Sequence, residues 1–180
     1  DSGIFSPTPN LDPEYYTQLE IGAKAKGAES SGEAAIYYTR IRDMIVASPT
    51  GAFLAGVPFL TKSNVGDGAL YGAEARGETS LARDWTGFAV ASWQDGIVDQ
   101  FTAAGVEVSE PTSRLMPLTA VLGATYQPEA CDWWVTIDTL IAHKADQLSI
   151  KDTTDTQRIP PGGTPGYGVL GVRCGKELTE

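Results

Sequence analysis

The stretch from Ile97 to Val108, IVDQFTAAGVEV, decides the predicted fold class. Its first half places apolar side chains at helical spacing, at Ile97, Val98, Phe101 and Ala104. Gly105 follows where a left-handed residue commonly ends a helix, and residues 106–108 alternate apolar and charged as a strand does. Because a helix, a glycine and a strand in this order are typical of α/β proteins, we predict that class.

Two further segments carry the spacing of amphipathic helices. Ser30 and Glu33 form a capping-box pattern before residues 31–47, where apolar side chains recur until Pro49. These apolar side chains are Ile36, Tyr37, Ile41, Met44 and Ile45. Residues 132–144 place Trp133 or Trp134 on one face with Ile137, Leu140 and Ile141. The sequence therefore predicts three main helices.

The remaining segments predict short strands and long loops. Residues 53–60 and 169–172 are expected strands, and the glycine- and proline-rich residues 64–77 and 160–168 are expected loops. Residues 1–14 carry Pro7, Pro9 and Pro13 and are expected to form an extended arm. We expect residues 15–180 to form a single globular domain with three main helices and a mixed sheet.

Composition limits the classes of partner. The 180 residues, 42% of them apolar, suffice for one domain with a hydrophobic core. A net charge of -10 disfavours nucleic acid and anionic lipid. No run approaches the roughly 20 apolar residues of a membrane-spanning helix, so we expect no membrane insertion by these residues. The chain begins with Asp1 rather than Met, and we expect that a preceding segment was removed.

Cys131 and Cys174 are the only two cysteines of the sequence. Paired, they would close a long loop in an exported protein and stabilise it by about 2–4 kcal/mol. Unpaired, they would be buried thiols of a cytoplasmic protein. A zinc site is not expected because His143 is the only histidine and no CxxC pair occurs, and no other metal or cofactor is predicted.

Five segments occur in the order found in one enzyme family. The first is LAGVPF at 54–59, followed by Lys62 and Asn64. Next come AAGV at 103–106 and GATY at 123–126. The last are Asp152-Thr153 with RIP at 158–160, and GVLGV at 168–172. Together they resemble the amidase signature family, and the resemblance implies that the chain is part of such a fold.

The resemblance implies a site built from a lysine and two serines that hydrolyses an amide C–N bond. Lys62 occupies the lysine position, but Thr156 and Asp132 occupy the two serine positions. A carboxylate beside Lys62 would keep the amine protonated and unable to act as a base. We therefore expect weak or no catalysis, with a small amide or acyl ligand or a protein partner bound instead.

Two alternatives remain open from the residues alone. Four tryptophans, seven tyrosines and the proline-rich arm suit a structural or assembly subunit of an exported complex, which would self-associate through residues 1–14. A carbohydrate-active enzyme would use two carboxylates near Trp85 and Trp93. The candidate carboxylates are Asp67, Glu74, Glu78, Asp84 and Asp95.

Overall fold

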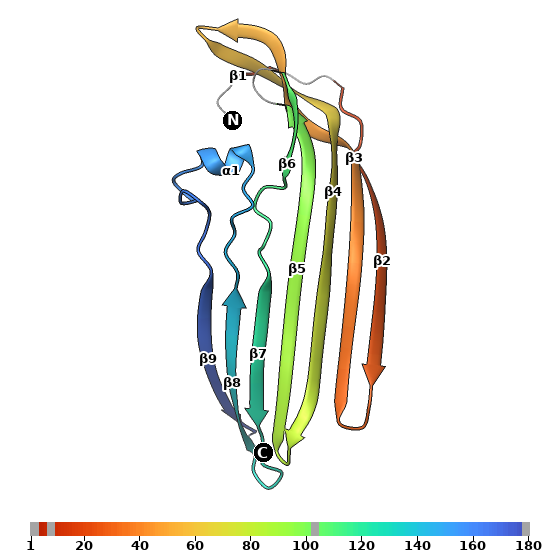
Figure 1. Cartoon of the computed structure of the whole chain (residues 1–180), viewed down its shortest axis with the longest axis vertical. Coiled ribbons are helices and arrows are strands. Elements are labelled where there is room, and N and C mark those ends of the chain that lie inside the picture. The colour runs from red at the N-terminus through yellow and green to blue at the C-terminus, as the bar shows by residue number, and fades with distance from the viewer. Residues whose placement is uncertain (1–3, 7–9, 102–104, 178–180) are drawn as a thin grey trace.

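The computed structural model describes residues 4–6, 10–101 and 105–177, which form one sheet of mostly long strands and one short helix (Figure 1). The strands are β1 Ile4–Phe5, β2 Tyr15–Lys26, β3 Ser30–Leu54, β4 Val57–Ala82, β5 Trp85–Phe101, β6 Glu107–Pro111, β7 Thr119–Tyr126, β8 Trp133–Ala142 and β9 Tyr167–Lys176. Helix α1 covers Ile150–Thr154. No helix among the described residues is both long enough and apolar enough to cross a membrane.

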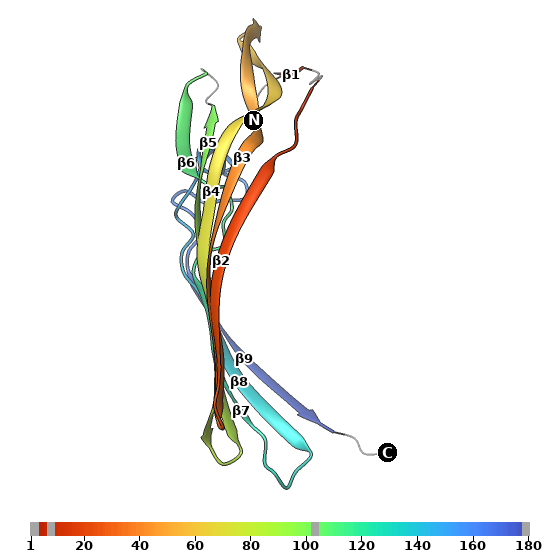
Figure 2. The ribbon, with the colours of Figure 1, turned by 90° about the vertical axis from the view of Figure 1, so that its right-hand side faces the viewer.

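The main sheet is antiparallel throughout, in the order β2-β3-β4-β5-β7-β8-β9. β6 pairs with the last part of β5, beyond the point where β7 leaves it. β1 pairs in parallel with β4 at Phe59 and Leu60. Seen from the side, the sheet is a single curved layer (Figure 2).

The two ends of the sheet differ in their connections. At one end, short turns at 27–29, 83–84 and 127–132 join consecutive strands. We call this the short-turn end. At the other, residues 112–118 and 143–166 form long connections, and the β3–β4 hairpin extends past its neighbours to a turn at Ala55 and Gly56 (Figure 1). We call this the long-loop end.

The structure lacks the compact core expected from the composition. Its accessible surface is 12286 Å², whereas a compact monomer of this mass exposes about 8,400 Å². The buried apolar side chains among the described residues are Ile41, Leu60, Val98 and Ala142. A single-layer sheet can bury neither face against itself, so most apolar side chains remain exposed.

The α/β prediction is wrong, because the three expected helices are strands. Residues 31–47 lie within β3, residues 97–101 end β5, and Trp133–Ala142 is β8. Residues 102–104 of the second expected helix are outside the described residues. Isoleucine, tyrosine and threonine dominate 36–41, and such β-branched and aromatic residues favour strands. Apolar side chains on both faces of β3 obscured its period-two alternation and imitated helical spacing.

The expected capping box at residues 30–33 is also wrong. Glu33 instead forms ion pairs with side chains of the two neighbouring strands. A true capping box begins α1, where Ser149 and Asp152 exchange hydrogen bonds with each other's backbone. The same pattern of residue types therefore has two outcomes, decided by which groups lie beside it.

The short strands and loops were predicted with mixed success. Residues 106–108 and 169–172 were expected strands, and β6 and β9 largely confirm them. The expected strand at 53–60 instead crosses the tip of the β3–β4 hairpin, and the expected loop at 64–77 lies inside β4. In the expected arm, residues 1–3 and 7–9 lie outside the described residues; β1 pairs with β4, and β2 begins at Tyr15.

Glycines inside the strands make room for large side chains of neighbouring strands. A Cβ at Gly72 would lie 2.5 Å from the Tyr37 hydroxyl oxygen and 2.5 Å from the Trp93 carbonyl oxygen. Phe88 fills the space at Gly123 in the same way. These glycines therefore do not mark loops, because they are needed for packing within the sheet.

We predict that Gly72→Ala destabilises the protein by about 1–3 kcal/mol, because the Trp93 backbone cannot move away cheaply. Equilibrium unfolding in urea measures this change. Gly168→Ala is the matched control, since its new Cβ would lie 3.8 Å from the nearest atom, the Leu140 carbonyl oxygen. Equal midpoints for the two variants would contradict the packing role of Gly72.

Candidate functional site

The strand register divides the side chains of the sheet between two faces of opposite character. One, the polar face, carries every charged side chain that the described strands place between the row paired with Tyr71 and the row paired with Trp85. They are Glu20, Lys24, Lys26, Glu33, Glu74, Arg76, Glu78, Asp138 and Arg173. The other, the apolar face, carries mostly alanine, leucine, isoleucine and aromatic side chains. Its larger members are Leu19, Ile21, Ile36, Tyr38, Tyr71, Trp85, Trp93, Leu122, Tyr126, Trp133, Ile137, Ile141, Leu170 and Val172.

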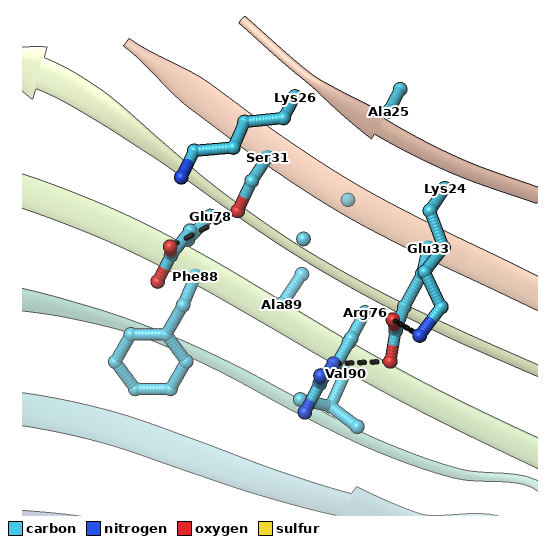
Figure 3. A pocket seen from close by; sticks show the side chains of 12 residues that line it. Lys24, Ala25, Lys26, Ser31, Glu33, Arg76, Glu78, Phe88, Ala89 and Val90 are labelled. Atoms are coloured by element: carbon cyan, nitrogen blue, oxygen red, sulfur yellow. Dashed lines mark hydrogen bonds and ion pairs between the residues drawn. The ribbon is translucent and has the colours of Figure 1, made fainter. Parts of the chain in front are cut away.

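Ion pairs join neighbouring strands across the polar face. Glu33 of β3 bridges Lys24 of β2, at 3.0 Å, and Arg76 of β4, at 2.6 Å (Figure 3). Further across the sheet, Arg173 of β9 pairs with Asp138 of β8 at 2.6 Å. Oppositely charged side chains on adjacent strands stabilise one register over its alternatives.

A cavity of about 600 Å³ lies on the polar face toward the short-turn end. Lys24, Glu33 and Arg76 line it, together with Lys26, Glu78 and the ring of Phe88 (Figure 3). Ser31 donates a hydrogen bond of 3.0 Å to Glu78. The lining offers amines, a guanidinium and carboxylates to a polar occupant. The residues that line it include no histidine and no cysteine.

The apolar face remains open over its whole width. Leu19, Ile36 and Leu170 are 66%, 59% and 73% exposed. Exposed apolar surface this continuous is unusual for a protein surrounded by water. In the described strands, no aspartate, glutamate, lysine or arginine lies on this face between the rows of Tyr71 and Trp85. Surfaces of this kind mark sites of contact with protein partners or membranes.

Aromatic side chains gather at both ends of this uncharged band. Toward the long-loop end, the Tyr71 and Trp93 rings lie 5.9 Å apart, with Tyr38 beside Tyr71 in register. Toward the short-turn end, the ring centroid of Tyr126 lies 4.9 Å from that of Trp85 and 5.6 Å from that of Trp133. Trp93 lies eight positions after Trp85 in β5, about 26 Å along the strand. Such paired girdles are typical of strands that cross a lipid bilayer.

A buried polar cluster fixes the connections at the long-loop end. Asp152 of α1 is 2% exposed and accepts hydrogen bonds from Ser113 at 2.6 Å and from Ser149 at 3.0 Å. Glu110, at the end of β6, accepts a 2.5 Å hydrogen bond from the Ile150 amide. These contacts hold the β8–β9 connection against the chain that leaves β6.

A model of the family described as TonB dependent receptor-like, beta-barrel matches residues 1–176. The chain belongs to this family. The family description names receptor-like proteins, which agrees with the leaning against an enzyme, whereas amide hydrolysis has no support. The family also agrees with an exported protein, and the cytoplasmic alternative has no support.

Solved transporters share the fold. The copper transporter OprC is 19% identical, with a TM-score of 0.70 over 94% of this chain and 24% of its own. The FrpB iron transporter from Neisseria meningitidis, F3-3 variant, is 14% identical, with a TM-score of 0.70 over 97% of this chain and 25% of its own. The chain thus spans about a quarter of the length of these structures. A comparison with the curated proteins finds no match.

The amidase resemblance is wrong, because the matched segments do not form an amidase fold. Lys62 lies in β4 opposite Ala47, in the hairpin at the long-loop end. Thr156 follows α1 in an exposed turn, whereas Asp132 precedes β8 at the short-turn end. The structure therefore places Asp132 apart from the other two. Ala103 and Ala104 of the second matched segment are outside the described residues.

The carboxylates and cysteines predicted to form sites are also spread over the sheet. Asp84 lies in a turn next to Trp85, and Asp95 lies beside Tyr71 on the apolar face. Glu74 and Glu78 lie on the polar face and Asp67 farther along β4, so the five carboxylates do not form one group. Neither the carbohydrate-active enzyme nor the assembly subunit fits the family. Cys131 and Cys174 are both free and exposed. Cys174 pairs in register with Val135, four residues beyond Cys131.

One sequence signal for the two faces was overlooked. Residues 15–26, YYTQLEIGAKAK, alternate between apolar and polar side chains over most of their length. Such alternation is typical of a strand between two unlike environments. Leu19, Ile21, Ala23 and Ala25 lie on the apolar face, whereas Glu20, Lys24 and Lys26 lie on the polar face.

We predict that Glu33→Gln leaves the urea midpoint of unfolding almost unchanged, because exposed ion pairs contribute little to stability. Lys24 and Arg76, which would lose their shared partner, are 82% and 68% exposed. Unfolding in urea measures the change, and Lys26→Gln, which removes a neighbouring charge without breaking this bridge, is the control. A large fall in the midpoint for Glu33→Gln alone would mean that the bridge is shielded from water.

We predict that acid loosens the α1 segment. Burial raises the pKa of Asp152, but hydrogen bonds from Ser113, from Ser149 and from the Arg114 backbone outweigh it and hold the pKa below its ordinary value. The carboxylate thus stabilises the segment above about pH 4, and this contribution is lost as pH falls through the lowered pKa. Hydrogen exchange of residues 149–155, corrected for intrinsic rates, should accelerate below pH 4, and Asp152→Asn should show fast exchange at pH 7. Unchanged protection in that variant would contradict the prediction.

Proposed function

We propose that this chain forms part of the wall of a β-barrel that crosses the outer membrane. Its apolar face meets lipid, and its polar face lines the interior of a receptor for solute uptake. The observation that carries the proposal is the separation of charge between the faces. Charged side chains occupy the polar face, and none lies on the apolar face within the band bounded by the two aromatic rows.

The dimensions of the strands support this proposal. A strand crosses a bilayer with about 9–11 residues at a tilt near 45°, and β2, β8 and β9 have 12, 10 and 10. At a tilt of about 40°, the 26 Å between Trp85 and Trp93 spans about 20 Å of membrane thickness. The apolar band of such barrels is about 25 Å tall.

The two edges of the sheet imply further strands. Among the described residues, no strand pairs with the outer side of β2 or of β9. Lipid offers no hydrogen bonds to free backbone groups, so an open edge cannot persist in the membrane. We infer that other strands of the complete barrel occupy both edges.

The connections support an orientation. Membrane barrels carry short turns on the periplasmic side and longer loops on the extracellular side. By this rule the turns at 27–29, 83–84 and 127–132 face the periplasm, and α1 and the β3–β4 hairpin lie outside the cell. The cavity of Lys24, Glu33 and Arg76 then lies inside the barrel, in its periplasmic half.

This proposal replaces the expectation of no membrane insertion. That expectation considered only runs long enough for a helix, whereas a strand in a barrel needs alternate residues to be apolar on one face. The copper and iron named for OprC and FrpB belong to those proteins. For this chain we propose membership of an uptake barrel, without a named solute.

The proposal predicts that Ala89→Arg impairs insertion into lipid by about 2–4 kcal/mol, the cost of an arginine at the bilayer midplane. Ala89 lies on the apolar face of β5, midway between Trp85 and Trp93. Ser92→Arg is the matched control because it adds the same charge on the polar face, opposite Glu74.

The measurement is the folded fraction of the full-length gene product after refolding into phospholipid vesicles, followed by its heat-modifiable mobility in gels. We expect Ser92→Arg to fold as the unmodified protein does. Equal folding of Ala89→Arg and Ser92→Arg would overturn the assignment of the two faces.

A further inference from the structure

Two arginines lie on the apolar face just beyond its aromatic row at the long-loop end. Arg40 and Arg42 follow Tyr38 along β3, and all three share a face because strand side chains alternate. Arg40 lies opposite Thr17 of β2 and Ala69 of β4. Both arginines are exposed, and none of the ion pairs among the described residues involves them.

We propose that Arg40, assisted by Arg42, binds the phosphate of a lipid headgroup in the leaflet at the long-loop end. This inference rests on the proposed membrane location of the sheet. A guanidinium presents paired N–H donors that match two phosphate oxygens, and it binds phosphate more directionally than an ammonium group does.

The heights of the two arginines fit the headgroup layer. Arg40 lies two residues beyond Tyr38 and Arg42 four, about 7 and 13 Å along the strand. At a tilt of about 40° these become about 5 and 10 Å above the aromatic row. The headgroup layer occupies roughly 5–8 Å on each side of the hydrocarbon core. An arginine side chain of ordinary length reaches this layer from both positions.

The neighbouring charges make Arg40 and Arg42 unequal as sites for an anion. Asp43, at a φ of 55° in a β-bulge, adjoins Arg42, and Asp67 of β4 lies opposite this bulge. Asp95 lies at the level of Tyr71, whose hydroxyl donates to it at 3.4 Å. Beside Arg40 the neighbours in register are Thr17 and Ala69, which carry no charge. Arg40 is therefore the stronger anion site and the one nearer the lipid.

The test titrates the detergent-solubilised full-length protein with phosphatidylglycerol and counts bound lipid by native mass spectrometry. We expect Arg40→Gln to weaken binding about fivefold, the usual effect of one basic residue near an anionic lipid surface. Arg42→Gln should weaken it less, because Asp43 and Asp67 already offset its charge. Arg173→Gln, which removes one cation from the polar face outside the cavity, should bind as the unmodified protein does.

Further arms identify the ligand chemistry. Galactosyl diacylglycerol, which has no phosphate, should bind equally to all variants, and inorganic phosphate at the lipid concentration should not compete. Arg40→Lys keeps the positive charge but lacks the paired N–H donors of the guanidinium, so it should bind phosphatidylglycerol at an intermediate level. This variant also tests the site if Arg40→Gln fails to fold.

Three results would overturn the inference: unchanged binding in Arg40→Gln, an equal loss in Arg173→Gln, or full competition by inorganic phosphate. A protein that folds but does not insert into lipid contradicts the proposed function. An inserted Arg40→Gln variant that retains full lipid binding contradicts only this site.

Discussion

The strands from β2 to β9 satisfy their backbone hydrogen bonds through the strands beside them, and this pairing dictates where every side chain lies. Successive residues point to opposite faces, and the antiparallel register aligns these faces across seven strands. Since no second layer covers either face, each must match its surroundings directly. Leucine, isoleucine and alanine therefore gather on one side, and the bridge of Lys24, Glu33 and Arg76 on the other.

The same constraint explains how a chain with few buried residues keeps a defined structure. Glycines such as Gly72 and Gly123 leave the space that the side chains of Tyr37 and Phe88 occupy on neighbouring strands. Ion pairs on the polar face then favour one register. At the long-loop end, where the regular pairing stops, Asp152 and Glu110 hold the connections through hydrogen bonds to nearby hydroxyl and amide groups. Rigidity thus comes from the strand ladder and from local polar contacts, and in the proposed membrane location lipid takes the place of a core.

The sequence allowed part of the fold to be predicted. The final strand near 169–172 and the strand near 106–108 were expected and lie in β9 and β6. The helix expected at 31–47 failed because β3 carries Tyr37 and Ile41 on its polar face as well as Ile36 and Tyr38 on its apolar face. That mixture gives the three- and four-residue spacing of a helix. The candidate site failed for a different reason, because short matches such as Arg158-Ile159-Pro160 carry no information about which strands lie side by side.

The sequence by itself determined the acidic charge, the excess of residues that favour strands, and the clear alternation of residues 15–26. These properties depend on residue type and spacing along the chain. Only the tertiary structure decided that Lys24, Glu33 and Arg76 meet, that Trp85 and Trp93 mark the two ends of one band, and that Arg40 lies beyond it. Those relations depend on register, and register arises from hydrogen bonds between strands that lie tens of residues apart in the sequence.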